Sequence, residues 1–308
     1  MITIVGAGMS GLLAARMMPH HFPIIWEQQP SLPNNHSAVL RFRSPSIGDI
    51  LNIPFKKVQM IKAVLPWRNP IADALSYSFK NSGKMRSDRS INAGLVVGER
   101  WIAPPDLVNQ MADHTDIDIK FNHTWDFSLP EKEPIISTIP MPVLMEKLKY
   151  PYFDDIDFIS VDGVNITACV WDSDAYVSLL VPAPEIPFSR LTLTGPQLTL
   201  ECPAINEWPI PSPSAEMVIR TAAELLGLDL EQITQVQSIP QKYAKIDPID
   251  DDIRKAFMHW ATTEHNIYSL GRFATWRPGL LLDDLINDVR LIDRWIKSGS
   301  KYEVAKRR

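Results

Sequence analysis

The sequence contains almost no cysteine, little glycine and no long apolar run. Its 308 residues include two cysteines and 13 glycines, against 26 prolines. No stretch approaches the ~18 consecutive apolar residues that a transmembrane helix needs. The cysteines, Cys169 and Cys202, form no Cys-x-x-Cys pair, so neither a disulfide framework nor a cysteine-rich metal site is supported. We therefore expect two reduced thiols and no membrane partner.

The net charge is small and acidic. The chain has 31 Lys+Arg and 36 Asp+Glu, a net charge of −5. This charge argues against a general nucleic-acid binder, although a local basic run could still contact nucleic acid. No basic segment followed by an apolar stretch precedes the first strand, so no signal peptide is expected and the predicted location is cytoplasmic. The apolar fraction of 45% is ordinary for a globular protein, and the length allows two domains.

Residues 2–27 read as strand, glycine turn, helix, strand and acid. The β-branched run at 2–5 is typical of a buried parallel strand. Gly6 permits a tight turn, Gly8 lets the backbone approach a pyrophosphate, and Gly11 allows close helix packing. The free N–H groups of the helix would face the phosphates, and Glu27 would accept hydrogen bonds from a ribose. This predicts a dinucleotide site; the acid disfavours NADP but leaves NAD and FAD open.

The rest of the chain alternates between helical and β patterns. Helices are expected at 71–79, 215–226, 249–264 and 280–298, and a buried strand at 134–140. Residues 156–202 predict an antiparallel sheet of short strands, with hairpin turns at Asp162-Gly163 and Gly195-Pro196. Residues 36–70 predict a loop or short strand and then irregular structure, and the basic run 80–89 a solvated loop. The expected fold class is α/β, Rossmann-like, with an inserted mainly antiparallel β (α+β) domain.

Three separated segments carry a family resemblance. They are Gly6–Glu27, the strand Ile135-Ile136-Ser137-Thr138-Ile139-Pro140, and Tyr268-Ser269-Leu270-Gly271-Arg272 with its following helix. Together they resemble the flavoprotein family that includes UDP-galactopyranose mutase, protoporphyrinogen oxidase and the amine oxidases. In that family the chain leaves the nucleotide domain, builds a substrate domain and returns to complete the flavin site.

The resemblance implies FAD as the cofactor and a discontinuous domain plan. The FAD-binding domain would comprise residues 1–60, 95–150 and 265–298, the substrate domain residues 61–94 and 151–264, and residues 299–308 a basic tail. In the N-terminal half the resemblance implies cofactor contacts from Gly6, Gly8, Met9, Ser10 and Gly11 at the pyrophosphate, Glu27 and Gln28 at the adenosine ribose, Arg41 at the diphosphate and Trp125 at adenine. In the C-terminal part it implies Gly271 and Arg272 at the pyrophosphate and ribityl chain, and Leu281, Leu282 and Asp283 at the start of the last helix. The double glycine that usually precedes the family's arginine is replaced here by Ala38-Val39.

Candidate catalytic residues are fewer and each has an ordinary alternative. The set is Arg43, Trp276, Lys242, His36 and Tyr176. Arg43 would hold an anionic substrate through bidentate hydrogen bonds, or form surface salt bridges. Trp276 would offer an aromatic plane or belong to the core, and Lys242 would correspond to the lysine of amine oxidases or be solvated. The histidines are scattered, with His20-His21 expected in a surface turn, so no metal site is predicted.

The leading hypothesis is an FAD-dependent oxidoreductase that oxidises a C–N bond of a small polar or anionic amine by hydride transfer to the flavin. The runner-up is a mutase-like use of reduced flavin on a nucleotide sugar. A third alternative is an amino-modified nucleotide or base in phage-type DNA, with the basic residues at 80–89 contacting phosphates. A non-catalytic dinucleotide-binding protein and a simple NAD-dependent dehydrogenase also remain open, and the sequence does not give the oligomeric state.

Overall fold

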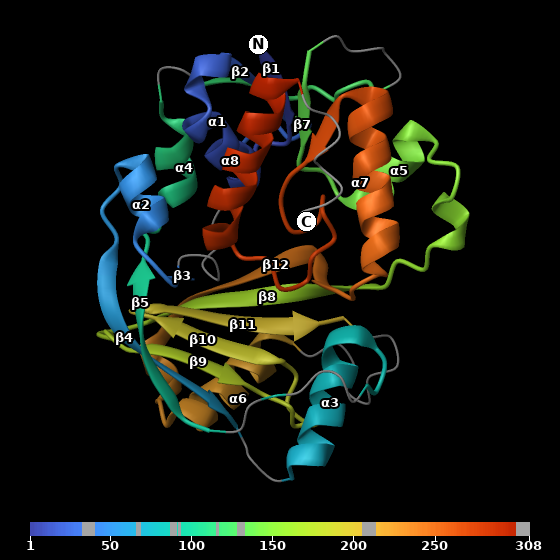
Figure 1. The fold of residues 1–308 in the computed structure, drawn as a ribbon. Helices are drawn as coiled ribbons and strands as arrows, with labels where there is room; N and C mark the ends of the chain where they lie inside the picture. The colour runs from blue at the N-terminus through green and yellow to red at the C-terminus, as the bar shows by residue number, and fades with distance from the viewer. Residues whose placement is uncertain are drawn as a thin grey trace. The chain divides into compact units, whose positions relative to one another are not determined.

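The computed structural model describes residues 1–32, 41–65, 69–86, 91, 94–114, 117–127, 133–204 and 214–299. The chain forms two compact units (Figure 1). The first unit comprises Met1–Phe55, Ala103–Phe158 and Pro248–Arg308, and the second comprises Lys56–Ile102 and Ile159–Asp247. Each unit is therefore discontinuous in sequence.

The first unit is built on a parallel sheet with strand order β13-β7-β1-β2-β6. These strands are β1 (Ile2–Val5), β2 (Pro23–Trp26), β6 (Asp118–Lys120), β7 (Ile135–Ser137) and β13 (Ile267–Ser269). Strands β7 and β13 are buried along their whole length, as expected for parallel strands that are covered on both faces.

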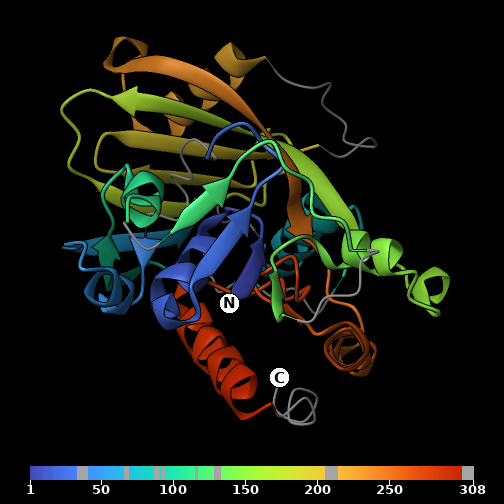
Figure 2. The ribbon, with the colours of Figure 1, turned by 90° about the horizontal axis from the view of Figure 1, so that it is seen from above.

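The helices of the first unit are α1 (Met9–Met17), α2 (Ser46–Leu51), α4 (Leu107–Ala112), α5 (Met141–Leu148), α7 (Asp251–His265) and α8 (Leu282–Ser298), with 3-10 turns at Pro19–His21 and Phe153–Asp155. The unit also contains the two-residue strand β3 (Arg41–Phe42). Helix α1 packs against α4 and α8, and α7 packs against β13. Figure 2 shows α8, in red, beside the blue N-terminal elements. The buried face of α8 carries Leu285, Val289, Ile292 and Trp295, which explains why this amphipathic segment forms a long helix.

The second unit is built on a sheet whose strands lie in the order β12-β8-β11-β10-β9-β4-β5. Their bounds are β4 (Lys56–Val64), β5 (Val96–Ile102), β8 (Ser160–Val170), β9 (Tyr176–Leu180), β10 (Arg190–Thr194), β11 (Gln197–Pro203) and β12 (Ile233–Ile246). All neighbours pair antiparallel except β4 and β9, which are parallel. The helices are α3 (Pro70–Ser82) and α6 (Ala215–Leu226), with a 3-10 turn at Leu230–Gln232.

Helix α6 closes the core of the second unit. The Ser214 hydroxyl accepts a hydrogen bond from Met217 N at 3.2 Å and so caps the helix start. Gly227, at φ +65°, ends the helix in the left-handed region. The buried side of α6 joins the apolar residues of β10 and β11 in one cluster. The sequence-based prediction of this helix is confirmed.

The predicted fold class is confirmed by the parallel sheet of the first unit and the largely antiparallel sheet of the second. The units divide the chain differently from the predicted domains at four places. Residues 56–60 and 95–102 belong to the second unit, and residues 151–158 and 248–264 belong to the first. The roles of the units as FAD-binding and substrate domains stay predictions. No helix in the described ranges is long and apolar enough to cross a membrane.

Two of the local predictions are wrong. Asp162-Gly163 is not a hairpin, because both residues lie inside the continuous strand β8. A β-carbon on Gly163 would lie 2.7 Å from Cys202 O, so the glycine serves close strand packing, and the irregularity falls on the partner strand between Gln241 and Lys245. Residues 36–70 are not irregular throughout, since their described part contains α2 and all of β4.

The described part of the basic run, residues 80–86, is not a solvated loop throughout. Helix α3 extends to Ser82, and the side chain of Lys80 is buried, with 2% of the residue exposed. Its ammonium donates to Val181 O and Ile186 O at 2.9 Å and to Phe188 O at 3.1 Å. Lys80 is therefore a structural cross-link of the second unit and does not offer a charge to nucleic-acid phosphates.

Candidate functional site

The glycine turn between β1 and α1 leaves no room for a side chain at Gly6 or Gly11. Gly6 has φ +102°, a conformation that L-residues rarely adopt. A β-carbon on Gly6 would lie 2.3 Å from Thr138 Oγ1, and one on Gly11 would lie 2.1 Å from Gly6 O. Gly6 N also donates to Trp26 O at 2.8 Å, which ties the turn to β2. Gly6 is thus required by its backbone conformation and by the Thr138 side chain, and Gly11 by the backbone on which it packs.

Gly8 differs from these two glycines because it faces open space. A β-carbon there would meet no atom within 4 Å. Gly8 is the N-cap of α1, and no described side chain caps this helix end and no acidic residue stands in its first turn. The N–H groups at the helix start are therefore available to an anion, and the helix dipole favours negative charge there. Met9 and Ser10 begin the helix at this edge.

The carboxylate of Glu27 holds the turn from the side of β2. Its Oε2 accepts from Ala7 N at 2.7 Å, and its Oε1 accepts from Gln29 N at 2.8 Å. Each carboxylate oxygen has a second acceptor site, so Glu27 retains capacity for ribose hydroxyls. Gln28, the next residue, is exposed.

A half-buried indole packs on the residue before this acid. The rings of Trp26 and Trp125 are 5.2 Å apart in an edge-on contact, and Trp26 directly precedes Glu27. The Nε1 atom of Trp125 is buried and has no hydrogen-bond partner among the described residues. Because buried donors are nearly always satisfied, this atom fits a group that accepts a hydrogen bond. The sequence places Trp125 at the adenine end, and this geometry is compatible with that role.

The C-terminal motif meets the N-terminal one. Gly271 has φ +103°, and a β-carbon on it would lie 2.6 Å from Ser10 Oγ. Leu270 N donates to Ser137 O at 2.9 Å, which fixes the approach of the chain from β13 alongside β7. Segments more than 130 residues apart thus converge at one edge of the sheet, as the resemblance implies. Arg272 follows with its guanidinium 5.4 Å from the centroid of the Phe273 ring.

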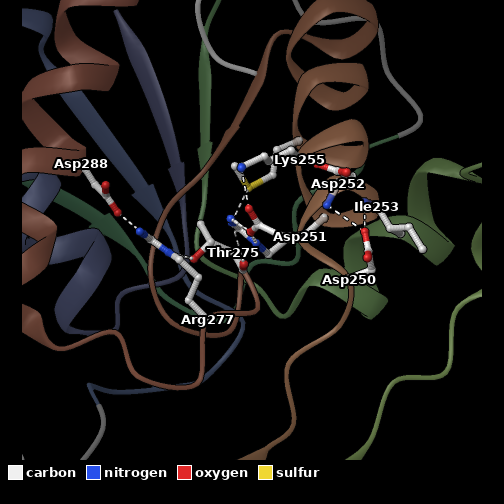
Figure 3. Close-up of polar contacts among 10 residues, drawn as sticks. Asp250, Asp251, Asp252, Ile253, Lys255, Thr275, Arg277 and Asp288 are labelled. Atoms are coloured by element: carbon white, nitrogen blue, oxygen red, sulfur yellow. Dashed lines mark hydrogen bonds and ion pairs between the residues drawn. The ribbon is translucent and has the colours of Figure 1, made fainter. Parts of the chain in front are cut away.

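A polar network supports the Gly271 loop from two helices (Figure 3). Thr275 Oγ1 donates to Gly271 O at 2.7 Å and accepts from Arg277 Nε at 3.0 Å. Arg277 in turn pairs with Asp288 of α8. From α7, the buried Arg254 donates to Thr275 O at 3.4 Å and pairs with Asp251. The loop is therefore held in one conformation.

Sequence reasoning missed this network and Thr138. Thr138 lies within the predicted strand 134–140 and directly follows β7, and its hydroxyl donates to Val5 O at 2.9 Å beside the glycine turn. Its position at the carboxyl end of a parallel strand was the available signal. The network around Thr275 had no such signal, because its partners are distant in sequence and follow no periodic pattern.

The start of α8 is anchored by Arg43. The Arg43 backbone N–H donates to Asp283 Oδ2 at 3.2 Å, and its guanidinium pairs with Asp283 and Asp284. Leu281 N donates to Asp284 Oδ2 at 3.0 Å, so this acid caps the helix. Leu281 is exposed and Leu282 half-buried. The charge of Arg43 is thus balanced by two carboxylates within the first unit. Arg41 stands two residues before Arg43, on β3.

Of the other predicted catalytic residues, one is buried in the first unit, two belong to the second unit and one lies outside the described residues. Trp276 is buried, with 1% exposed, and its ring contacts Phe158 edge-on at 4.9 Å, which matches the core alternative. Tyr176 belongs to the second unit, where its hydroxyl donates to Asp174 at 2.7 Å. Lys242 lies on the same unit's β12, exposed, 5.5 Å from the ring centroid of Tyr243. His36 lies outside the described residues.

Comparison with known proteins finds relatives in structure but not in sequence. No family model matches the chain, and no curated protein matches it. A reduced UDP-galactopyranose mutase superposes with a TM-score of 0.69 at 15% identity, over 99% of this chain and 96% of the other. Glycine oxidase from Bacillus cereus ATCC 14579 gives 0.60 at 15% identity, over 100% and 98%. L-proline dehydrogenase from P. horikoshii gives 0.54 at 10% identity, over 98% and 95%.

Identities this low show a shared fold. They confirm, at the level of the fold, the resemblance to the family that includes UDP-galactopyranose mutase. The match extends over nearly the whole length of both chains, so the second unit, which the sequence alone did not identify, is included in the shared architecture.

Proposed function

We propose that this chain is an FAD-dependent oxidoreductase. The observation that carries the proposal is the convergence of three segments at the carboxyl edge of the parallel sheet. There the glycine turn at Gly6 contacts Thr138, and Gly271 contacts Ser10. A dinucleotide site alone requires only the first segment. The third segment, which returns from the far end of the chain, favours a flavin over a nicotinamide cofactor.

The residues of the first unit fit FAD in three places. The uncapped start of α1 with the open space at Gly8 suits a pyrophosphate. The spare acceptor sites of Glu27 suit the adenosine ribose, and the unsatisfied Nε1 of Trp125 suits an acceptor on the adenine side. The start of α8 at Leu281, Leu282 and Asp283, held by Arg43, is assigned to the flavin end, where a helix dipole stabilises negative charge.

FAD, when bound, supplies the two-electron acceptor. The protein then has to position a substrate carbon next to nitrogen for hydride transfer, while the nitrogen loses a proton and the C–N bond becomes an imine. A small amino acid is the substrate class that we favour, because glycine oxidase and L-proline dehydrogenase share the fold. Arg43, Tyr176, Lys242 and His36 remain candidates for the substrate site, whereas the burial of Trp276 argues for a core role.

A mutase-like reaction on a nucleotide sugar is the second candidate. The superposition on UDP-galactopyranose mutase, at a TM-score of 0.69, favours it. The two candidates differ in electron balance, because the mutase-like reaction returns the flavin to its starting redox state, whereas amine oxidation leaves it reduced.

Anaerobic absorption spectroscopy separates the two. The protein, purified without a tag and loaded with FAD, is mixed with glycine, L-proline or UDP-galactopyranose under argon. Bleaching of the visible flavin bands by an amino acid would support amine oxidation. Interconversion of the sugar ring only after chemical reduction of the flavin would support the mutase-like reaction. Retention of FAD without either reaction, over broad panels of amines and nucleotide sugars, would overturn both substrate classes.

A further inference from the structure

We propose that His20, His21 and Asp293 form a binding site for a divalent transition-metal ion, with Zn²⁺ as the favoured occupant. The site lies in the first unit and is formed by the 3-10 turn after α1 and the outer face of α8. The proposal does not depend on the identity of the cofactor. No metal site was expected from the sequence, because Asp293 lies more than 270 residues from the two histidines.

The geometry brings three ligand atoms together. His20 Nε2 lies 3.0 Å and His21 Nε2 lies 2.8 Å from the same oxygen, Asp293 Oδ1. One donor atom from each of the three residues lies within 4.8 Å of the others. A metal ion with bonds of about 2.0–2.2 Å to nitrogen and oxygen needs ligand atoms at close to this spacing.

The backbone holds the two histidines in place. Pro19 opens the turn, His21 N donates to Met18 O at 3.1 Å, and Phe22 N donates to Pro19 O at 2.9 Å. Phe22 then leaves the turn at φ +51°. The imidazole rings of His20 and His21 are 4.2 Å apart. Helix α8 packs against α1, which directly precedes this turn. Both sides of the site are thus fixed before any ion binds.

The surroundings supply an outer partner for the carboxylate. Lys297 Nζ donates to Asp293 Oδ2 at 2.8 Å and leaves Oδ1 directed at the histidines. Hydrogen bonds to the second oxygen of a ligating carboxylate are a regular feature of metal sites. Side-chain exposures of 44% for His20 and 15% for His21 give an ion access from solvent.

The ligand set and the local charge define the ion. Two imidazoles and one carboxylate suit zinc and its neighbours, whereas magnesium and calcium prefer oxygen ligands alone. Three protein ligands leave the fourth position to water. Arg290 and Arg294 line the same surface depression as Asp293, and their repulsion predicts weaker binding than at a four-ligand structural site. Binding would cross-link the end of the α1 segment to α8.

Isothermal titration of ZnCl₂ into the tag-free, full-length protein tests the site. One ion per chain is expected. Asp293→Asn keeps the size of the side chain and removes the anionic ligand, and His21→Gln removes an imidazole while retaining a polar group. Each should weaken Zn²⁺ binding by more than the roughly 10–100-fold that changes outside the ligand shell cost. His114→Gln, at an exposed histidine outside the cluster, is the matched control and should bind as the parent does.

Thermal unfolding gives a second readout. Zn²⁺ should raise the melting temperature of the parent and of His114→Gln, and should leave Asp293→Asn and His21→Gln unchanged, because an ion that binds only the folded state stabilises it by mass action. A parent that binds no Zn²⁺ would overturn the proposal. Equal affinity and stoichiometry in the parent and both cluster variants would also overturn it.

Discussion

In the first unit the tightest contacts surround glycine backbone, whereas in the second unit the most buried charge is a lysine side chain. Gly11 packs on Gly6 O with no space for a β-carbon. Lys80, in contrast, reaches across its unit to three carbonyl groups at 2.9–3.1 Å. The glycine turn of the first unit is thus organised by the absence of side chains, and the contact of α3 with its sheet in the second unit by a specific side chain.

This difference explains why the sequence predicts the first unit better than the second. A glycine requirement leaves a spaced motif that can be recognised in one sequence. A buried lysine looks the same in sequence as a solvated one, because its partners are backbone carbonyls that carry no sequence signature. Paired substitutions in each unit test this contrast.

The largest effect is expected at Gly11. Gly11→Ala should destabilise the first unit by more than about 3 kcal/mol, because the new methyl group meets backbone that cannot move aside. Gly8→Ala is the matched control, since its methyl group enters open space, and its free energy of unfolding should change by less than about 0.5 kcal/mol. Denaturant unfolding followed by circular dichroism measures both. Equal stability of the two variants would disprove the packing role of Gly11.

The second unit should respond nearly as strongly at Lys80. Lys80→Met should cost about 3 kcal/mol or more, because each buried carbonyl that loses its donor costs about 1–3 kcal/mol. Lys84→Met removes an exposed lysine of the same basic run and should be nearly neutral. Urea titrations of the two variants give the comparison, and a stable Lys80→Met protein would show that the three carbonyls find other donors.

A moderate effect is expected in the loop that carries Gly271. Thr275→Val removes the hydroxyl that links Gly271 O to Arg277 and should cost about 1–2 kcal/mol. FAD should also dissociate faster from this variant, because the loop loses its fixed conformation. Thr263→Val is the control, since that hydroxyl donates to His259 O and Trp260 O within its own helix. Flavin fluorescence during dilution measures the dissociation rates; identical rates would remove the loop from the cofactor site.

The smallest effect concerns Cys202 in the second unit. Desolvation raises the pKa of its thiol to about 12, with Lys80 opposing and Glu201 adding to the shift. The thiol of an unfolded chain has a pKa of ~8.5. Between that pH and about 12 the unfolded chain loses the thiol proton while the folded protein keeps it, so the stability of the fold decreases as the pH rises through this range. At pH 9, iodoacetamide should therefore alkylate Cys202 much more slowly in the folded protein than in urea. Mass spectrometry measures the two rates, and equal rates would contradict the desolvation.

Much of the first unit could be predicted from sequence and less of the second. The glycine turn, the strand before Thr138 and the return at Gly271 were located because backbone requirements select residue types at fixed spacing. The continuous strand β8 was misread at Asp162-Gly163, because a dipeptide typical of turns here serves close packing against Cys202 O. Cross-links such as Arg254 to Thr275, and the cluster of His20, His21 and Asp293, depend on tertiary proximity that no local pattern records.

Titration of FAD and of NAD into the flavin-free protein is the most direct measurement. FAD should bind at one per chain, NAD should not compete, and Gly8→Val should weaken FAD binding because its side chain occupies the space at the start of α1. Gly98→Val, in β5 of the second unit, should bind FAD as the parent does. Binding of NAD in place of FAD, or FAD affinity unaffected by Gly8→Val, would contradict an FAD site in the first unit.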